Sequence, residues 1–200
     1  MANTTFFPLK LRTVALALWA VQVHASGQAQ VQAQVQSQVA EAPRAVTPIA
    51  ALDVPRYMGA WFEVAKYPNR FQRQCVRNTT AEYALQGDGT VRVTNRCVTA
   101  QGDTIEAVGQ ARQVGAATSP KLEVRFAPAW LSFLPMVWGD YWVIDLDDGY
   151  SLVAIGEPQR HFLWVLSRTP QVDAQAYEAL LGRLAQQGFD VTRLERTPQQ

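Results

Sequence analysis

The chain has 200 residues, which is enough for one domain, or for one domain with a tail. Its formal net charge of +1 gives no reason to expect a nucleic-acid partner. Only two histidines are present, which argues against a histidine-rich metal site, and we expect neither a metal nor a cofactor.

The first 25 residues have the pattern of a secretory signal peptide. Lys10 and Arg12 precede an apolar stretch from Val14 to Val23, and Val-His-Ala at 23–25 is a small-residue cleavage site. The apolar stretch is too short to span a bilayer stably. Because the first cysteine is Cys75, we see no acceptor for a lipoprotein anchor. We therefore expect an exported protein, periplasmic or secreted; an uncleaved N-terminal anchor or an outer-membrane association is the alternative.

Residues 26–48 are expected to form a low-complexity linker. Gln alternates with Ala, Val or Ser from Gln28 to Val39, and two prolines follow before residue 49. This composition is typical of a flexible spacer. The folded domain is then expected over residues 49–195, followed by a polar tail over residues 196–200.

Eight apolar or alternating runs, separated by turn residues at short spacing, predict an all-β barrel or sandwich. One helical turn over 53–58 precedes them, with Asp53 as its N-cap. The Asp-Gly pairs at 88–89 and 148–149 favour tight turns, and therefore antiparallel pairing of consecutive strands. The expected strands are 60–66, 79–86, 90–97, 104–113, 121–126, 140–146, 150–156 and 162–167.

Residues along these strands alternate between apolar and charged, which indicates one buried face and one wet face. Val91 and Val93 oppose Arg92, and Leu122 and Val124 oppose a charged face that ends with Arg125. An outer-membrane barrel is disfavoured, because its strands need about nine to eleven residues and these are about seven long. The C-terminal segment 173–187 has an amphipathic helical pattern and is expected to pack on the outside of the barrel.

The two cysteines of the chain, Cys75 and Cys97, flank a predicted hairpin. In an exported protein such a pair tends to form a disulfide, which would stabilise the fold by about 3 kcal/mol. A nucleophilic or metal-binding thiol is the weaker alternative, since no histidine is near in the sequence.

Three short motifs appear in order along the chain. Gly59-Ala60-Trp61 opens the first strand, Asp147 and Tyr150 lie in a turn, and Arg168 ends the last strand. An indole across the barrel floor can be covered by a guanidinium from the last strand, a contact that contributes about 0.5 to 2 kcal/mol.

With these motifs, residues 53–190 resemble the lipocalin family, and within it the bacterial lipocalins that are similar to apolipoprotein D. The turn sequence around Asp147 departs from the usual Thr-Asp-Tyr form, and the anchoring cysteine common in this subgroup is absent. The resemblance implies an eight-stranded antiparallel up-and-down β-barrel with a C-terminal α-helix outside. It also implies reversible binding of a fatty acid, lysophospholipid or similar lipid inside the barrel, and no reaction.

Candidate ligand contacts follow from strand alternation and from the side on which Trp61 lies. They are Tyr83, Leu85, Val91, Val93, Leu122, Val124, Phe126, Tyr141 and Val143.

The mouth of the barrel is expected at the end opposite Trp61, at 67–78, 98–103, 127–139 and 157–161. The segment 127–139 is unusually apolar for a loop and adds Trp130 and Phe133 as candidate contacts. Three interpretations stay open for it: a lid, a membrane or partner contact, and burial against the rim. Arg70 and Arg73 could meet an anionic headgroup.

The leading hypothesis is a non-enzymatic carrier or scavenger of lipids, without catalytic residues. The rival hypothesis is an enzyme in the same barrel, for which Glu63 and Asp145 would be the inward carboxylates and Cys75 the nearby thiol. A third hypothesis is a protein-interaction module that uses the apolar 127–139 loop. The sequence also leaves a transient membrane contact and a homodimer open.

Overall fold

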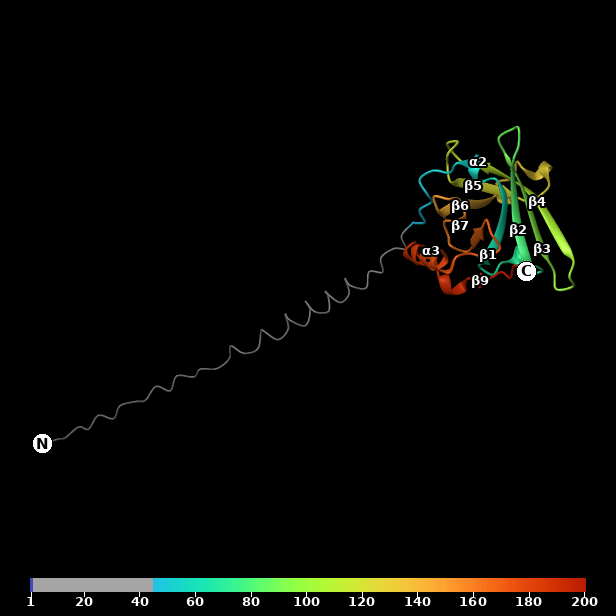
Figure 1. Cartoon of the computed structure of the whole chain (residues 1–200). Coiled ribbons are helices and arrows are strands. Elements are labelled where there is room, and N and C mark those ends of the chain that lie inside the picture. The colour runs from blue at the N-terminus through green and yellow to red at the C-terminus, as the bar shows by residue number, and fades with distance from the viewer. Residues whose placement is uncertain (2–44) are drawn as a thin grey trace. The chain divides into compact units, whose positions relative to one another are not determined.

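Figure 1 shows the computed structural model, which describes Met1 and residues 45–200. The expected signal peptide and most of the expected linker lie outside the described residues. The packing of the domain begins slightly before the expected boundary at Ile49, because Val46 is buried and the Thr47 N–H donates to the Gln187 side chain at 3.0 Å.

Eight antiparallel strands close into a barrel, as the sequence predicts. Each strand pairs with the next in the chain, and β8 pairs back with β1 to complete the ring. The strands are β1 (Gly59–Lys66), β2 (Arg77–Leu85), β3 (Val91–Val98), β4 (Thr104–Gln113), β5 (Lys121–Arg125), β6 (Gly139–Leu146), β7 (Leu152–Gly156) and β8 (Leu163–Ser167).

A ninth strand, β9 (Glu195–Arg196), is missing from the sequence prediction. β1 pairs with β2 only from Gly59 to Phe62, and beyond that point the C-terminal segment lies beside β1. The Thr197 N–H donates to the Val64 carbonyl at 3.1 Å, and the Gln199 side chain donates to the carbonyls of Glu63 and Thr79. The segment expected to be only a polar tail is therefore part of the barrel wall.

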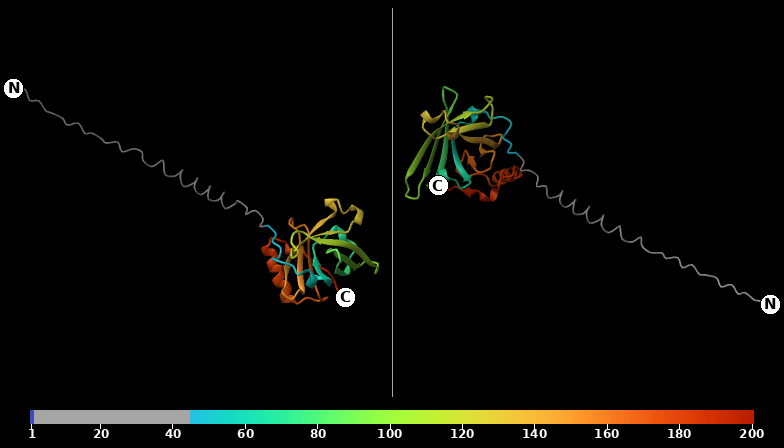
Figure 2. Two further views of the ribbon diagram at one scale, coloured as in Figure 1. Left: turned by 90° about the horizontal axis from the view of Figure 1, so that it is seen from above. Right: turned by 180° about the vertical axis from the view of Figure 1, so that it is seen from behind.

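The C-terminal helix α3 (Ala174–Gln186) packs on the outside of the barrel, which confirms the prediction (Figure 2). The Asp173 carboxylate caps it by accepting from the Ala176 N–H at 2.8 Å. Tyr177, Leu180 and Leu184 form its buried face. Within the described residues, no helix combines the length and the apolar character needed to cross a membrane.

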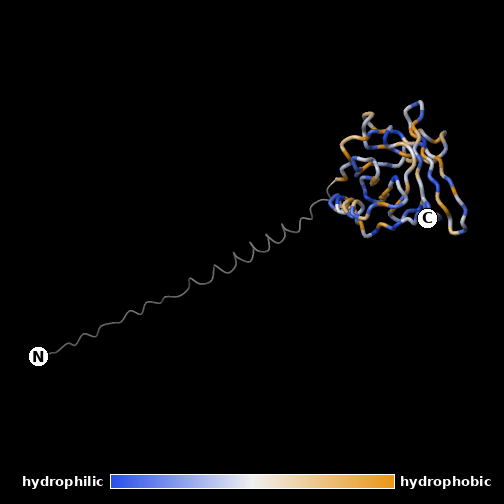
Figure 3. Tube along the Cα trace, in the orientation of Figure 1, coloured by the Kyte–Doolittle hydropathy of each residue, from blue (hydrophilic) through white to orange (hydrophobic). Residues whose placement is uncertain are grey.

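Two hydrophobic clusters divide the buried side chains. One fills the barrel interior and contains Trp61, Tyr83 and Val93, while the other lies between the outer wall and α3 and contains Val64 and Leu180. Figure 3 shows hydrophilic and hydrophobic residues mixed along the strands, as expected when successive side chains point to opposite faces of the barrel wall. β7 is buried throughout, because both clusters use its side chains.

The short helix α2 (Val54–Tyr57) precedes β1 at the end of the barrel where Trp61 lies. The Asp53 carboxylate caps it by accepting from the Arg56 N–H at 3.2 Å. The Leu52 N–H donates to the Thr118 carbonyl at 2.8 Å, so the segment before α2 is tied to the β4–β5 connection. This segment covers one end of the barrel, which we call the closed end.

Candidate functional site

Trp61 is fully buried at the closed end of the barrel. The guanidinium carbon of Arg168 lies 3.9 Å from the centre of its ring, and the indole N–H donates to the Tyr57 carbonyl at 2.9 Å. Arg168 also donates to the carbonyls of Ala60 and Arg56, each at 2.9 Å. A cation–π contact and three hydrogen bonds thus hold the floor of the barrel together.

The turn between β6 and β7 belongs to the same assembly. Asp147 accepts hydrogen bonds from the Ser151 and Leu152 N–H groups at 2.7 and 2.6 Å. Burial would raise the pKa of Asp147, but the hydrogen bonds outweigh it and the pKa is lowered. The Tyr150 hydroxyl accepts from the Asp53 N–H, so the turn is joined to the start of α2.

Gly59 completes the closed end. Its φ of 93° is a backbone conformation that favours glycine. A Cβ at this position would lie 3.4 Å from the Nη1 atom of Arg168, so the glycine also leaves room for the guanidinium. The three motifs that are distant in the sequence therefore meet in one place.

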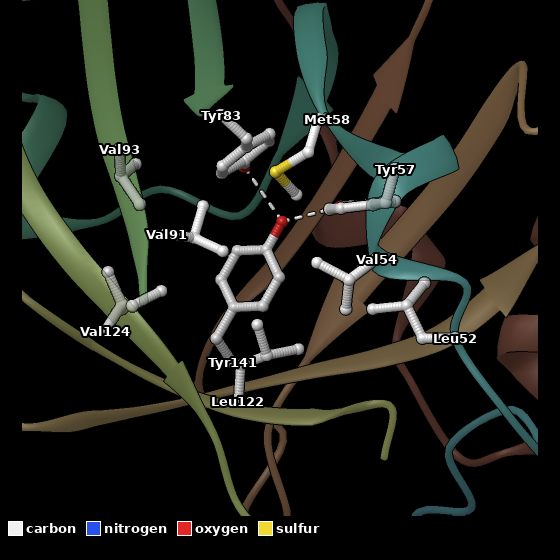
Figure 4. A pocket seen from close by; sticks show the side chains of 11 residues that line it. Leu52, Val54, Tyr57, Met58, Tyr83, Val91, Val93, Leu122, Val124 and Tyr141 are labelled. Atoms are coloured by element: carbon white, nitrogen blue, oxygen red, sulfur yellow. Dashed lines mark hydrogen bonds between the residues drawn. The ribbon is translucent and has the colours of Figure 1, made fainter. Parts of the chain in front are cut away.

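Three tyrosine hydroxyl groups meet above this floor, in the barrel interior (Figure 4). The Tyr141 hydroxyl lies 2.7 Å from that of Tyr57 and 2.8 Å from that of Tyr83. Burial raises the pKa of all three phenols, that of Tyr83 to about 12. The three phenols are therefore neutral at physiological pH and satisfy one another's hydrogen bonds.

The interior cavity beside these tyrosines is small. Its volume of about 10 Å³ has room for about one water molecule. Six of the expected residues line it: Tyr83, Val91, Val93, Leu122, Val124 and Tyr141. The sequence reasoning missed five others: Leu52, Val54, Tyr57, Met58 and Ala111.

Most of the missed lining residues come from the segment that includes α2. Strand alternation cannot find them, because they do not belong to a strand. Apolar residues before the N-cap and at the fourth helical position, here Leu52 and Tyr57 around Asp53, are a signal that the start of the helix packs inward.

The other expected contacts lie elsewhere. Val143 is fully buried in the core but does not line the cavity. Leu85, at the end of β2, is 48% exposed, and Phe126, just after β5, is 45% exposed. Trp130 and Phe133 are 73% and 74% exposed, so neither lines the interior in this structure. Strand alternation predicts whether a side chain points into or out of the barrel. It does not predict whether an inward side chain near the end of a strand is covered by other residues.

The segment 127–139 contains two short 3-10 helices, η2 (Ala129–Leu131) and η3 (Pro135–Val137). The exposure of Trp130, Phe133 and Met136 shows that burial against the rim is wrong for these three side chains. Trp138, in contrast, folds back and packs on Arg112 and Arg125, whose guanidinium carbons lie 4.1 and 5.2 Å from its ring centres.

Arg125 corrects a second expectation. The alternation of β5 places it on a wet outer face, but it is only 6% exposed. Trp138 covers it, and its Nη1 and Nη2 atoms donate to the Ala127 carbonyl and to the Gln110 side chain. A residue outside the strand therefore buries a charge that the strand pattern leaves in water.

The two carboxylates of the enzyme hypothesis lie in different surroundings. Glu63 is buried and accepts hydrogen bonds from Gln72 at 2.5 Å and Thr197 at 2.6 Å, with Lys66 at 3.8 Å. Burial raises its pKa. These partners engage both carboxylate oxygens, in a network that ties β1 to the C-terminal segment.

Asp145 is wrong as an inward carboxylate. The register of β6 against β7 shifts between Val143 and Asp145, and this bulge turns Asp145 outward. There it forms an ion pair with Arg183 of α3 at 2.6 Å. The thiol alternative is also wrong, because Cys75 and Cys97 form the expected disulfide.

A second hollow lies outside the barrel. It is a groove of about 400 Å³ between α3 and η4 (Val191–Arg193) with the start of the C-terminal segment. Its walls are mainly apolar, and the Arg196 guanidinium lies over the Tyr177 ring at 4.3 Å. This groove is larger than the interior cavity and is not where the sequence places the ligand.

Comparisons with known proteins agree with the barrel fold. Residues 52–199 match the family model described as a lipocalin-like domain. Temperature-induced lipocalin-1 of Arabidopsis thaliana is 39% identical over 153 residues, which cover 76% of this chain and 81% of the relative. Outer membrane lipoprotein Blc of Escherichia coli K12 is 35% identical, with 76% and 81% covered. Mouse apolipoprotein D is 29% identical, with 74% and 77% covered.

Solved structures share the fold at low sequence identity. Insecticyanin of the tobacco hornworm Manduca sexta superposes with a TM-score of 0.59 at 21% identity, covering 76% of this chain and 83% of that one. The cockroach allergen Per a 4 gives the same TM-score at 19% identity, covering 78% and 94%.

Proposed function

The chain belongs to the lipocalin family, known for binding small hydrophobic ligands, and we propose that it reversibly binds a fatty acid, a lysophospholipid or a similar lipid inside its barrel. The observation that carries this proposal is the interior lining. Apart from three tyrosines whose hydroxyls bond one another, every lining side chain is apolar, and none is charged. An acyl chain can replace its water contacts there without leaving a polar group unpaired.

Binding requires side chains of the interior to move. The cavity of about 10 Å³ is far below the roughly 300 Å³ or more that drug-sized ligands occupy. Met58, which lies over the tyrosines in Figure 4, is unbranched and can change rotamer at small cost. Each methylene that a ligand buries contributes about 0.8 kcal/mol, which offsets this rearrangement as the chain lengthens.

The polarity of the two ends supports one orientation of the ligand. The acyl tail lies toward the tyrosines, whose hydroxyls are already paired. The headgroup stays at the mouth, where Arg70 and Arg73 are exposed and can meet a carboxylate or phosphate. Because Glu63 is held by its own partners and Asp145 faces outward, we propose binding and transport without a reaction.

We also propose that the protein is exported, to the periplasm or the medium. This rests on the signal-like sequence of residues 1–25 and on relatives that are named outer membrane lipoproteins. Cell fractionation of a tagged full chain tests it, and retention in the cytoplasm with an uncleaved N-terminus would contradict it.

The binding proposal is tested by native mass spectrometry of the purified protein, followed by identification of extracted lipid. The delipidated protein is then titrated with long-chain fatty acids and lysolipids while its tryptophan fluorescence is followed. Val93→Trp, which fills the interior, is expected to abolish binding. The matched control is Val108→Trp on the exposed outer face of β4, which should bind normally. Saturable binding that Val93→Trp leaves unchanged would refute an interior site.

A further inference from the structure

Large apolar side chains are exposed mainly at the mouth. Within residues 45–200, nine large hydrophobic residues are exposed, and six of them lie in or beside the connections at the mouth end. These six are Phe71, Val76, Phe126, Trp130, Phe133 and Met136. The other three, Leu85, Val108 and Val114, are scattered over β2, β4 and the turn after β4.

The loop 127–139 is the centre of this distribution. It contains no charged residue, and Trp130, Phe133 and Met136 are 73%, 74% and 85% exposed. Isolated exposed apolar residues are normal, but three large ones on one uncharged loop mark an interaction surface.

Five backbone N–H groups of this loop are bonded within it. Successive 3-10 bonds run from Leu131, Ser132 and Leu134 to carbonyls three residues earlier, and Val137 and Trp138 do the same. Pro128 and Pro135 have no N–H to satisfy. These bonds hold the loop in a defined conformation and reduce the number of N–H groups that lose water when the loop contacts lipid.

The base of the loop is fixed to the barrel. Trp138 packs on the guanidinium groups of Arg112 and Arg125, and its indole N–H donates to the Ser132 carbonyl at 2.8 Å. Arg112 is in turn paired with Glu123 at 2.8 Å. The base of the loop is therefore fixed to the barrel, and the loop backbone needs little further ordering when the exposed side chains bind.

Cations lie at the same end of the barrel. Arg70 and Arg73 are exposed in and after η1 (Arg70–Gln72), in the β1–β2 connection, and no ion pair within the described part of the chain engages either. The β1–β2 and β5–β6 connections share an end because consecutive strands are antiparallel. Arginines beside exposed aromatic residues complement anionic headgroups above an acyl layer.

We propose that the mouth end docks on an anionic lipid bilayer, with Trp130, Phe133 and Met136 in the interface and Arg70 and Arg73 against the headgroups. This goes beyond ligand binding, because docking does not need an occupied cavity. It orients the mouth toward the membrane, so that a lipid can pass between bilayer and barrel.

Flotation of the full chain with vesicles of phosphatidylcholine, with and without phosphatidylglycerol, tests the proposal. Combined Trp130→Ser, Phe133→Ser and Met136→Ser changes should weaken binding at least about tenfold, given the apolar area removed. The matched control is the combined change of Leu85, Val108 and Val114 to Ser, which should bind as the unchanged protein does. Equal binding by all three proteins, or no binding by any, overturns the proposal.

Two further measurements test the aromatic and the cationic part of this surface separately. Brominated acyl chains should quench tryptophan fluorescence, and Trp130→Phe should remove most of the quenching; quenching unchanged in that variant overturns the insertion of Trp130. Arg70→Gln with Arg73→Gln should remove the preference for phosphatidylglycerol, and an unchanged preference overturns the headgroup contact.

The docking and cavity proposals fail separately. Val93→Trp should float with vesicles although it binds no soluble fatty acid. If Val93→Trp loses vesicle binding while its circular dichroism spectrum is unchanged, the contact with lipid runs through the cavity and docking by the rim is wrong.

Discussion

The two ends of the barrel use the same kinds of side chain in opposite ways. At the closed end, Trp61 is fully buried and lies under Arg168. At the mouth, Trp130 is 73% exposed, while Trp138 packs on two arginines to hold the loop in place. Tryptophan and arginine thus close the fold at one end and support an open surface at the other.

The difference separates the end that stabilises the fold from the end at which we propose membrane docking. The closed end joins three distant motifs, because Arg168 donates to the carbonyls of Tyr150 and Ala60 and lies over the Trp61 ring. The mouth leaves apolar surface in water, which contributes little to folding stability and is available to a lipid or another partner. Changes at the two ends should therefore differ in what they damage.

The largest effect is expected for Trp61→Ala. Removing a fully buried indole should lower the free energy of unfolding by about 3–5 kcal/mol. Trp130→Ala is the matched control, and urea unfolding compares the two. If both variants lose the same stability, the contrast between the ends is wrong.

The disulfide should come next, and it strengthens the mouth end. Replacing Cys75 and Cys97 by Ser opens a loop of 22 residues and should cost about 3 kcal/mol. Urea unfolding of the double variant measures it. A stability that matches that of the unchanged protein would mean that strand pairing alone orders the β1–β2 connection.

Alkaline pH should weaken the tyrosine cluster of the interior. The pKa of Tyr83 is raised from 10.0 to about 12, so the folded protein holds this proton longer than the unfolded chain. The stability it contributes is complete below pH 10 and is lost as the pH rises toward 12, by about 3 kcal/mol in total. Near-ultraviolet absorbance of tyrosinate, recorded with circular dichroism, checks this. Ionisation of all tyrosines near pH 10 in a folded protein would contradict it.

A smaller effect is expected from the ion pair between Asp145 and Arg183. Arg183 is about half exposed, so Arg183→Met should lower stability by no more than about 1 kcal/mol. The loss should shrink with added salt, and thermal unfolding at two ionic strengths measures it. A loss that is independent of salt would mean that packing of α3, and not charge, is affected.

The smallest effect on stability is expected at the rim. Phe133→Ser removes an exposed side chain and should change the free energy of unfolding by less than about 0.5 kcal/mol. Urea unfolding checks it. A loss above about 2 kcal/mol would mean that the loop packs on the barrel in solution.

Local sequence signals were enough to predict the eight strands, the outer helix and the disulfide, whereas the contact of Trp61 with Arg168 rests on the barrel and the family resemblance. Strand alternation, turn residues and an amphipathic helical pattern each involve residues that are close in the sequence, so they can be recognised without a structure. The bulge after Val143 is not, because one extra residue reverses the face of Asp145 without changing composition.

Other parts depend on segments that are distant in the chain. β9 is only two residues long and polar, and its pairing arises because β2 diverges from β1. Arg125 is buried by Trp138 from the following loop, and much of the cavity lining comes from around α2. Alternation within strands contains none of this information.

The central claim, that the ligand lies inside the barrel, is tested most directly by methyl NMR with a spin-labelled fatty acid. The label should broaden the methyl signals of Val91, Val93 and Val124, which line the interior. Broadening of Leu181 and Leu194 instead would place the ligand in the outer groove beside α3 and contradict the claim.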